Sequence, residues 1–313
     1  MYIFTSFCLW LALYAPMPLL WQPLLALLDY APRWLVLLLL PLCLLGSKPS
    51  KSFVLFIVLT TLVNFWLLFD ISLALASKSP ATSDTRTYKI ATFNVASGRV
   101  DAAAIFDWYN SEHLDALLLQ ESPPAALKQE LPANLTLDCH GNLCLLTQHS
   151  FKAVRQLDRR ALQGWGHYAA HYLLLLDEVE VNLVNLHLNT PRHGFELLHA
   201  PLSNYSAITR AYKNQVFESM VASELISVDQ GLSMIGGDFN LTQKSRIYQQ
   251  YWSEWSNAFN KVGFGIGYTK NSRLMGSRID HILTGSKIQP LHAEVYSAMG
   301  SDHKPLVLEF AFQ

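Results

Sequence analysis

The sequence predicts an α/β protein in which strands dominate, preceded by an apolar N-terminal region. Short apolar runs recur from Lys89 to the C-terminus, and several alternate apolar with polar residues, as half-buried strands do. Two helix-like stretches, 102–113 and 206–227, lie among these runs. Charged residues are sparse up to Ala76 and ordinary in frequency after it. These observations favour one sizeable domain of layered sheets and helices behind a membrane region.

The apolar region predicts transmembrane helices. Only 15% of the chain is charged, whereas an average soluble domain has about a quarter. A membrane helix needs ~20 mostly apolar residues. Residues 2–28 and 53–76 reach that length, and 34–45 needs flanking residues to do so. A cleaved signal peptide fits poorly, because the start is uncharged and further apolar stretches follow. We therefore expect two or three transmembrane helices within 1–76.

Basic residues in the short loops predict the orientation. Lys48 and Lys51 separate the second and third stretches, and Arg33 separates the first two. Because basic loops stay in the cytoplasm, the chain after the third stretch is expected on the other side. Residues 77–88 are polar and predict a linker to a domain over 89–313. In a bacterial cell, this arrangement anchors the protein in the inner membrane with its domain in the periplasm.

Two cysteines flank a predicted hairpin turn. Cys139 and Cys144 lie on either side of a Gly-Asn pair between strand-like runs. A disulfide across the hairpin would fit an oxidising compartment. Unbonded buried cysteines are a second interpretation. A metal site with His140 is a third, although zinc sites with four protein ligands usually need another ligand pair elsewhere.

The strand-like runs follow one another along the domain. The aromatic segment YWSEWSNAF (251–259) could touch lipid or stack on bases, but we expect it to pack on the core. The predicted strands are KIATFNV (89–95), DALLLQE (115–121), LCLLTQ (143–148), YAAHYLLLL (168–176), VEVNLVNLHL (179–188), LSMIGGDFNL (232–241), RIDHILTG (278–285), LHAEVYS (291–297) and KPLVLEFAF (304–312).

Polar residues collect at the ends of these strands. Taken singly, each fits a turn or a helix cap more readily than a site. Together they indicate function, because loop ends on a rigid sheet are a common place for functional groups. The residues are Asn94, Glu121, His187, Asn189, Asp238, Asn240, Asp280, Asp302 and His303.

In order and spacing, these motifs resemble the endonuclease/exonuclease/phosphatase superfamily, which includes deoxyribonuclease I-like nucleases. The resemblance covers 89–313 and implies a four-layer αββα sandwich of two mostly antiparallel sheets. One departure is Ala96, where some nuclease relatives have an acidic or amide residue. The segments that carry the resemblance are TFNV (92–95), LLLQES (117–122), VNLHLNTP (184–191), GGDFN (236–240), RIDHIL (278–283) and GSDHKPL (300–306).

The resemblance implies a metal site and a phosphate site. It makes Glu121 the main metal ligand, places Asn94 where the family binds metal or phosphate, and places His187 on the scissile phosphate. Hard oxygen ligands such as Glu121 and Asp302 suit Mg²⁺, with Mn²⁺ as the alternative. We therefore expect phosphodiester hydrolysis that depends on a divalent cation.

The remaining residues suggest how water would be activated. His303 is the expected general base, and Asp280 would orient its imidazole. Asp238 would position the water or its proton. Asn240 and His187 would hold non-bridging phosphate oxygens by hydrogen bonds.

The sequence leaves the substrate open. After Ala76 the chain has 20 Lys and Arg and 22 Asp and Glu, a formal charge of −2. Nucleic-acid-binding domains usually show a basic face, so a phospholipid or small phosphodiester at the membrane is slightly favoured over nucleic acid. The expected partners are membrane lipids and this substrate, and no feature indicates a protein partner. A non-catalytic receptor for a phosphorylated ligand is a third hypothesis, which the complete set of acidic and histidine residues disfavours.

Overall fold

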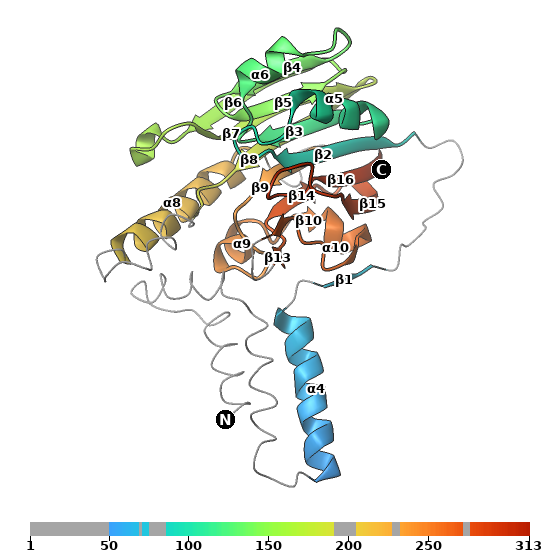
Figure 1. Ribbon diagram of the computed structural model, residues 1–313, viewed down its shortest axis with the longest axis vertical. Coiled ribbons are helices and arrows are strands. Elements are labelled where there is room, and N and C mark those ends of the chain that lie inside the picture. Colours follow the sequence, from blue (N-terminus) through green and yellow to red (C-terminus); the bar gives the residue numbers. More distant parts are fainter. Residues whose placement is uncertain (1–49, 69–70, 75–85, 191–204, 227–231, 272–275) are drawn as a thin grey trace.

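The computed structural model describes residues 50–68, 71–74, 86–190, 205–226, 232–271 and 276–313. Two six-stranded β-sheets pack against each other, and helices cover the outer face of each (Figure 1). The layers are those of the αββα sandwich that the sequence predicts. Each sheet is mostly antiparallel and has one parallel pair of strands near its centre.

One sheet has the strand order β15-β16-β2-β3-β5-β4. Its parallel pair is β2 with β3, and the other neighbours are antiparallel. The β4–β5 hairpin turns at Gly141, where φ is +60°, a backbone conformation that glycine adopts without steric cost. The strands are β2 (Tyr88–Asn94), β3 (Ala116–Gln120), β4 (Thr136–His140), β5 (Leu143–Thr147), β15 (Ile288–Val295) and β16 (Leu306–Phe312).

The other sheet has the order β10-β14-β9-β8-β7-β6. Its parallel pair is β8 with β9. The strands are β6 (Phe151–Asp158), β7 (His167–Leu176), β8 (Val179–His187), β9 (Ser233–Asp238), β10 (Ser256–Asn257) and β14 (Asp280–Thr284).

Alternation along the strands builds three apolar layers. In β3, Leu118 faces the other sheet, while Leu117 and Leu119 face the helices α5 (Ala102–Ser111) and α6 (Pro124–Gln129). On the opposite side of the sandwich, α8 (Tyr205–Ser223) and α9 (Arg246–Tyr251) cover β8 and β9. Both faces of the central strands are therefore buried, which explains why they appear as continuous apolar runs.

The aromatic segment 251–259 packs in the core, as expected. Trp252 is fully buried, and Trp255 and Phe259 are at most 8% exposed. Phe259 belongs to α10 (Ala258–Val262), which packs against β14 and β15. The segment is therefore mainly structural, and only Tyr251 of its aromatic residues is partly exposed.

The N-terminal region differs in part from the prediction. The stretches 2–28 and 34–45 lie outside the described residues. The third stretch was expected to be one helix over 53–76, but α4 (Lys51–Leu68) ends earlier, and β1 (Ser72–Leu73) pairs with β11 (Phe264–Gly265) of the domain. The Ser72 hydroxyl donates to the Gly263 carbonyl over 2.9 Å. Within the described part of the chain, no helix has both the length and the apolar character for a membrane crossing.

Candidate active site

Each sheet has one pair of parallel strands, and the two pairs end at the same place. At the carboxyl ends, Asn94 on β2 lies opposite Gln120 on β3, and His187 on β8 lies opposite Asp238 on β9. Asn94 Nδ2 donates to Asp238 Oδ2 over 2.9 Å and so joins the two sheets. The polar strand ends that the sequence singled out therefore form one cluster.

Asn94 links two carboxylates. Its Nδ2 also donates to Glu121 Oε1 over 3.1 Å, while its Oδ1 accepts from the backbone N of Ala96 over 2.9 Å. Ser97 Oγ donates to the second oxygen of Glu121 over 3.0 Å. Asn94 thus directs its nitrogen, and not its oxygen, towards the carboxylates. This orientation supports a role in organising Glu121 and Asp238 and does not provide the oxygen that a metal ligand needs.

Asp238 is a deeply buried carboxylate of the cluster, at 1% exposure, as is Asp280. At the preceding residue, Gly237, strand β9 runs very close to β8: a Cβ there would lie 1.8 Å from the carbonyl oxygen of Leu186. This close approach therefore requires glycine just before Asp238. The second Asp238 oxygen accepts from the backbone N of Asn240 over 2.8 Å. Burial and repulsion from Asp280 raise the pKa of Asp238 to about 7. The ionised form of Asp238 is therefore disfavoured in this cluster, and a nearby cation would stabilise it.

His303 and Asp280 form a buried hydrogen-bonded pair. Asp280 opens β14 directly opposite Asp238, and its two oxygens lie 2.9 and 3.1 Å from His303 Nδ1. An ionised carboxylate only accepts hydrogen bonds, so Nδ1 carries the proton. His303 Nε2 lies on the other side of the ring, 3.6 Å from Asp238 Oδ2. Burial lowers the pKa of His303, but the charges of Asp280 and Asp238 outweigh it and raise that pKa to about 9.

His187 faces the same cluster. Its Nε2 is 3.7 Å from Glu121 Oε1 and 3.9 Å from Asp238 Oδ2. Burial and the positive charge of Arg159 lower the pKa of His187 to about 4. A neutral imidazole can hydrogen-bond a phosphate oxygen without adding charge.

Arg159 and Glu218 hold the backbone around His187. Arg159 pairs with buried Glu218 over 2.8 Å and donates to the His187 carbonyl over 2.6 Å. Glu218, on α8, also accepts from the backbone N of Asn189 over 2.6 Å. The amide Nδ2 of Asn240 donates to the Leu188 carbonyl over 2.9 Å. The strand end that carries His187 is therefore fixed from both sides.

Asp302 forms an ion pair with a lysine. Its Oδ2 lies 2.5 Å from Nζ of Lys270. Lys270 lies in the short strand β12 (Lys270–Asn271), and it is directly opposite His303 in an isolated antiparallel bridge. The carboxylate predicted to bind metal thus forms an ion pair at the edge of the cluster.

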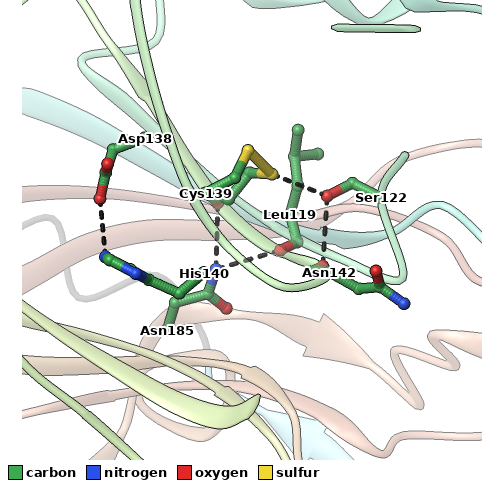
Figure 2. Close-up of a disulfide and its surroundings, with 8 residues drawn as sticks. Leu119, Ser122, Asp138, Cys139, His140, Asn142 and Asn185 are labelled. Atoms are coloured by element: carbon green, nitrogen blue, oxygen red, sulfur yellow. Dashed lines mark hydrogen bonds and ion pairs between the residues drawn. A yellow bond between two sulfur atoms is a disulfide. The ribbon is translucent and has the colours of Figure 1, made fainter. Parts of the chain in front are cut away.

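A disulfide supports the backbone next to Glu121. Cys139 and Cys144 lie directly opposite each other in the β4–β5 hairpin and are bonded. Figure 2 shows Ser122 beside this bond, with its hydroxyl 3.0 Å from Cys144 Sγ and 3.2 Å from the Asn142 carbonyl oxygen. The backbone N of Ser122 also donates to the Asn142 carbonyl, over 3.1 Å. Glu121 itself has φ of +50°, an uncommon conformation for a residue with a side chain. The hairpin therefore holds Glu121 in a conformation that it would rarely adopt alone.

Residues 91–303 match the Endonuclease/Exonuclease/phosphatase family. The chain belongs to this family. Members of the family are nucleases and phosphatases, enzymes that hydrolyse phosphoesters, and they generally depend on a divalent metal. No curated protein matches the sequence.

Solved structures from the same family share the fold. The D. rerio TDP2, humanised by 14 mutations, has a TM-score of 0.56 at 14% identity and covers 72% of this chain and 98% of its own. An AP endonuclease from Archaeoglobus fulgidus has a TM-score of 0.54 at 14% identity, with 72% and 99% covered. The mannosyl-6-phosphatase Bt3783 of Bacteroides thetaiotaomicron has 0.52 at 17% identity, with 72% and 100% covered. These likenesses extend over nearly the whole of each relative's length.

The donor set fits the divalent cation that the family uses. Asp238, Asp280 and His303 lie close enough to share an ion, but a 2.9 Å hydrogen bond commits His303 Nδ1 to Asp280, which leaves only Nε2 of this imidazole for a cation. Glu121 suits a cation better, because its side chain is 35% exposed. Burial raises its pKa, but the charge that His187 carries when it is protonated, together with hydrogen bonds from Asn94 and Ser97, outweighs burial and holds that pKa below the ordinary value. An ionised carboxylate that reaches solvent matches Mg²⁺, which keeps several of its waters.

The structure adds residues that sequence reasoning missed. Ser97, Lys270 and Arg159 each bind a predicted site residue or its backbone, and nothing in their local sequence marks them. Glu218 did have a signal: it is an acidic residue within the apolar run VFESMV of α8, and such residues are rarely buried without a partner.

Proposed function

We propose that this protein is a divalent-metal-dependent phosphoester hydrolase in which His303 activates the attacking water. The observation that carries the proposal is the convergence of Glu121, Asp238, Asp280 and His303 from both sheets around Asn94. A divalent cation at Glu121 would neutralise phosphate charge and orient the phosphate group. Mg²⁺ is the expected ion, and Mn²⁺ would substitute for it.

Each side chain has a role that follows from its contacts. With a pKa of about 9, His303 has both ring nitrogens protonated at neutral pH, and a cation bound in the cluster would lower that pKa and favour loss of the Nε2 proton. Nε2 would then accept the proton of water, since Nδ1 already donates to Asp280. Asp280 would keep the ring in that tautomer and stabilise the imidazolium, as the third member of a catalytic triad does. Asp238, facing Nε2, would position the water. His187 would donate a hydrogen bond to a non-bridging oxygen, and Asn240 would join it if its amide left the Leu188 carbonyl.

The test is hydrolysis of a panel of phosphoesters by the full chain in detergent. The full chain is needed because β1 pairs with the domain, so a fragment beginning at Lys78 would lose that strand. The panel contains plasmid DNA, RNA, sphingomyelin, phosphoinositides, nucleotides, bis-p-nitrophenyl phosphate and p-nitrophenyl phosphate, each with Mg²⁺ or with EDTA. The proposal predicts hydrolysis of at least one substrate with Mg²⁺ and none with EDTA. Hydrolysis that is insensitive to EDTA, or none at all, would count against it, and binding without hydrolysis would favour the receptor hypothesis.

The same panel separates the two substrate classes. Among the structural relatives, one is named as an AP endonuclease and another as a mannosyl-6-phosphatase, so the shared fold is compatible with both nucleic acids and small phosphoesters. The chain's near-neutral charge favours a phospholipid or small phosphoester over nucleic acid. Faster turnover of DNA or RNA than of every lipid and small substrate would reverse this preference.

We also propose that the N-terminal region anchors the protein in a membrane, with the domain outside the cytoplasm. The helix α4 exposes large apolar side chains, each at least 39% accessible: Phe53, Val54, Leu55, Phe56, Val58, Leu59 and Leu62. The Cys139–Cys144 disulfide suits an oxidising compartment. Resistance to alkaline extraction from bacterial membranes, and digestion of the domain by protease added to spheroplasts, would support this placement. Release into the soluble fraction by alkali would contradict it.

A further inference from the structure

Lys270 lies on the same side of its strand as His303. Residues 269–271 run antiparallel to 302–304: Lys270 is directly opposite His303, and the backbone N of Asn271 donates to the Asp302 carbonyl over 3.1 Å. Side chains of directly opposed residues in an antiparallel pair lie on one face, close together. The Lys270 side chain therefore leaves the backbone beside His303, and its ammonium group is near enough for its charge to oppose the rise in the pKa of His303.

Asp302 holds this ammonium group in place. Its carboxylate pairs with Lys270 Nζ over 2.5 Å, and the two side chains are 20% and 22% exposed. A free lysine side chain has many rotamers, and ordering it loses conformational entropy. Because the ion pair with Asp302 has already ordered the Lys270 side chain, binding of a ligand to Lys270 loses less side-chain entropy. The remaining exposure leaves room for such a ligand.

Two other cations near the cluster are committed to protein groups. Arg159 binds Glu218 and the carbonyls of His167 and His187. Arg278, at 2% exposure, donates to the Ile266 carbonyl and to Asn260 Oδ1. Lys270 differs from both, because its partner is a partly exposed carboxylate at the edge of the site. An ammonium group has three donors, so it can bind a second anion while keeping Asp302.

We propose that Lys270 binds an oxygen of the substrate phosphate and that Asp302 positions Lys270. The inference rests on the proposed function, because it needs a phosphate group in the cluster beside His303. It assigns Lys270 a substrate-binding role, and it gives Asp302 a positioning role in place of the metal-binding role that the family resemblance implies.

The first test is Lys270→Met, which keeps the length of the side chain and removes its charge. In the full-length protein, KM for the best panel substrate and the dissociation constant of inorganic phosphate, measured calorimetrically with Mg²⁺ present, should each rise roughly 10- to 100-fold, the effect of one hydrogen bond to a charged group. Mn²⁺ affinity without phosphate should not fall. Lys270→Arg should restore part of the phosphate affinity, and Lys270→Gln replaces Lys270→Met if the latter fails to fold.

Lys304→Met is the matched control. It removes the same charge one residue from His303, but its side chain lines the apolar pocket with Phe259 and Tyr268. Phosphate affinity should therefore remain at the wild-type value. Equal losses in Lys304→Met and Lys270→Met would show that net charge alone matters, which would overturn the assignment of Lys270.

Asp302→Asn separates the two roles of the aspartate. If Asp302 positions Lys270, this variant loses phosphate affinity but keeps Mn²⁺ affinity, and the double variant with Lys270→Met is no weaker than Lys270→Met alone. Loss of Mn²⁺ affinity with normal phosphate binding would make Asp302 a metal ligand and end the inference. Wild-type protein that binds phosphate but hydrolyses no substrate would instead contradict the proposed function. The two failures can be distinguished, because the phosphate-binding and Mn²⁺-binding measurements do not require turnover.

Discussion

Replacing His303 by alanine removes the group that we expect to take a proton from water. In the folded protein its Nδ1 is fixed by Asp280 at 2.9 Å, and its Nε2 faces Asp238 at 3.6 Å. A positioned general base contributes about 10²- to 10⁴-fold to the rate, or about 2.7–5.5 kcal/mol of barrier. Because His303 is deeply buried and hydrogen-bonded, it is pre-oriented, and we expect His303→Ala to lower kcat at least about 100-fold.

The assay is hydrolysis of bis-p-nitrophenyl phosphate, or of the best substrate of the panel, at saturating Mg²⁺. Folding is checked by circular dichroism and Mn²⁺ affinity by calorimetry, so that a loss of turnover can be assigned to chemistry. His292→Ala is the matched control, because its imidazole is exposed on β15 and its hydrogen bond is to Glu294. Near-normal turnover by His303→Ala, with folding and metal binding intact, would remove His303 from the mechanism.

Three further predictions concern metal binding and stability. Glu121→Gln should weaken Mn²⁺ binding at least about tenfold, and unchanged affinity in calorimetry would exclude Glu121 as the main ligand. Replacing Cys139 and Cys144 by serine opens a short loop and should cost about 2 kcal/mol of unfolding free energy, measured in urea; a midpoint equal to that of wild type would contradict this value. Burial lowers the pKa of His281 to about 4, so its protonation favours the unfolded state. The free energy of unfolding should therefore be about 3 kcal/mol lower at pH 4 than above pH 6.5. The His281→Gln variant should lose less unfolding free energy than wild type over this pH range. An equal loss in the variant and in wild type would show that protonation of His281 is not the cause.

The central strands could be predicted because they are buried on both faces. Strands β3 (ALLLQ) and β9 (SMIGGD) are fully buried in the structure, and residues 116–119 and 234–237 within them carry no polar side chain. The edge strands β4 and β6 carry polar residues and are partly or largely exposed, so their sequences, TLDCH and FKAVRQLD, lack that signal. The edge strand β15 is also mostly not buried, but residues 291–297 alternate enough to be predicted in part. Burial on both faces therefore made strands easiest to recognise, and alternation revealed one edge strand.

The site could be predicted only as a set of strand ends. Asn94, His187 and Asp238 end strands whose apolar residues are easy to recognise, and parallel pairing brings them together. The partners that hold these groups come from distant loops and helices. Arg159 and Glu218, for example, are 59 residues apart along the chain. Pairing over such a distance depends on how the loops pack, which no local pattern records.

Anomalous diffraction from crystals of the full-length protein soaked in Mn²⁺ would test the central claim directly. The claim is that groups from both sheets form one pocket that holds a divalent cation for phosphoester hydrolysis. We predict an anomalous peak within about 2.2 Å of a Glu121 carboxylate oxygen, on the side that faces Asp238 and His303. A peak bound elsewhere, with Glu121 free of metal, would contradict the account.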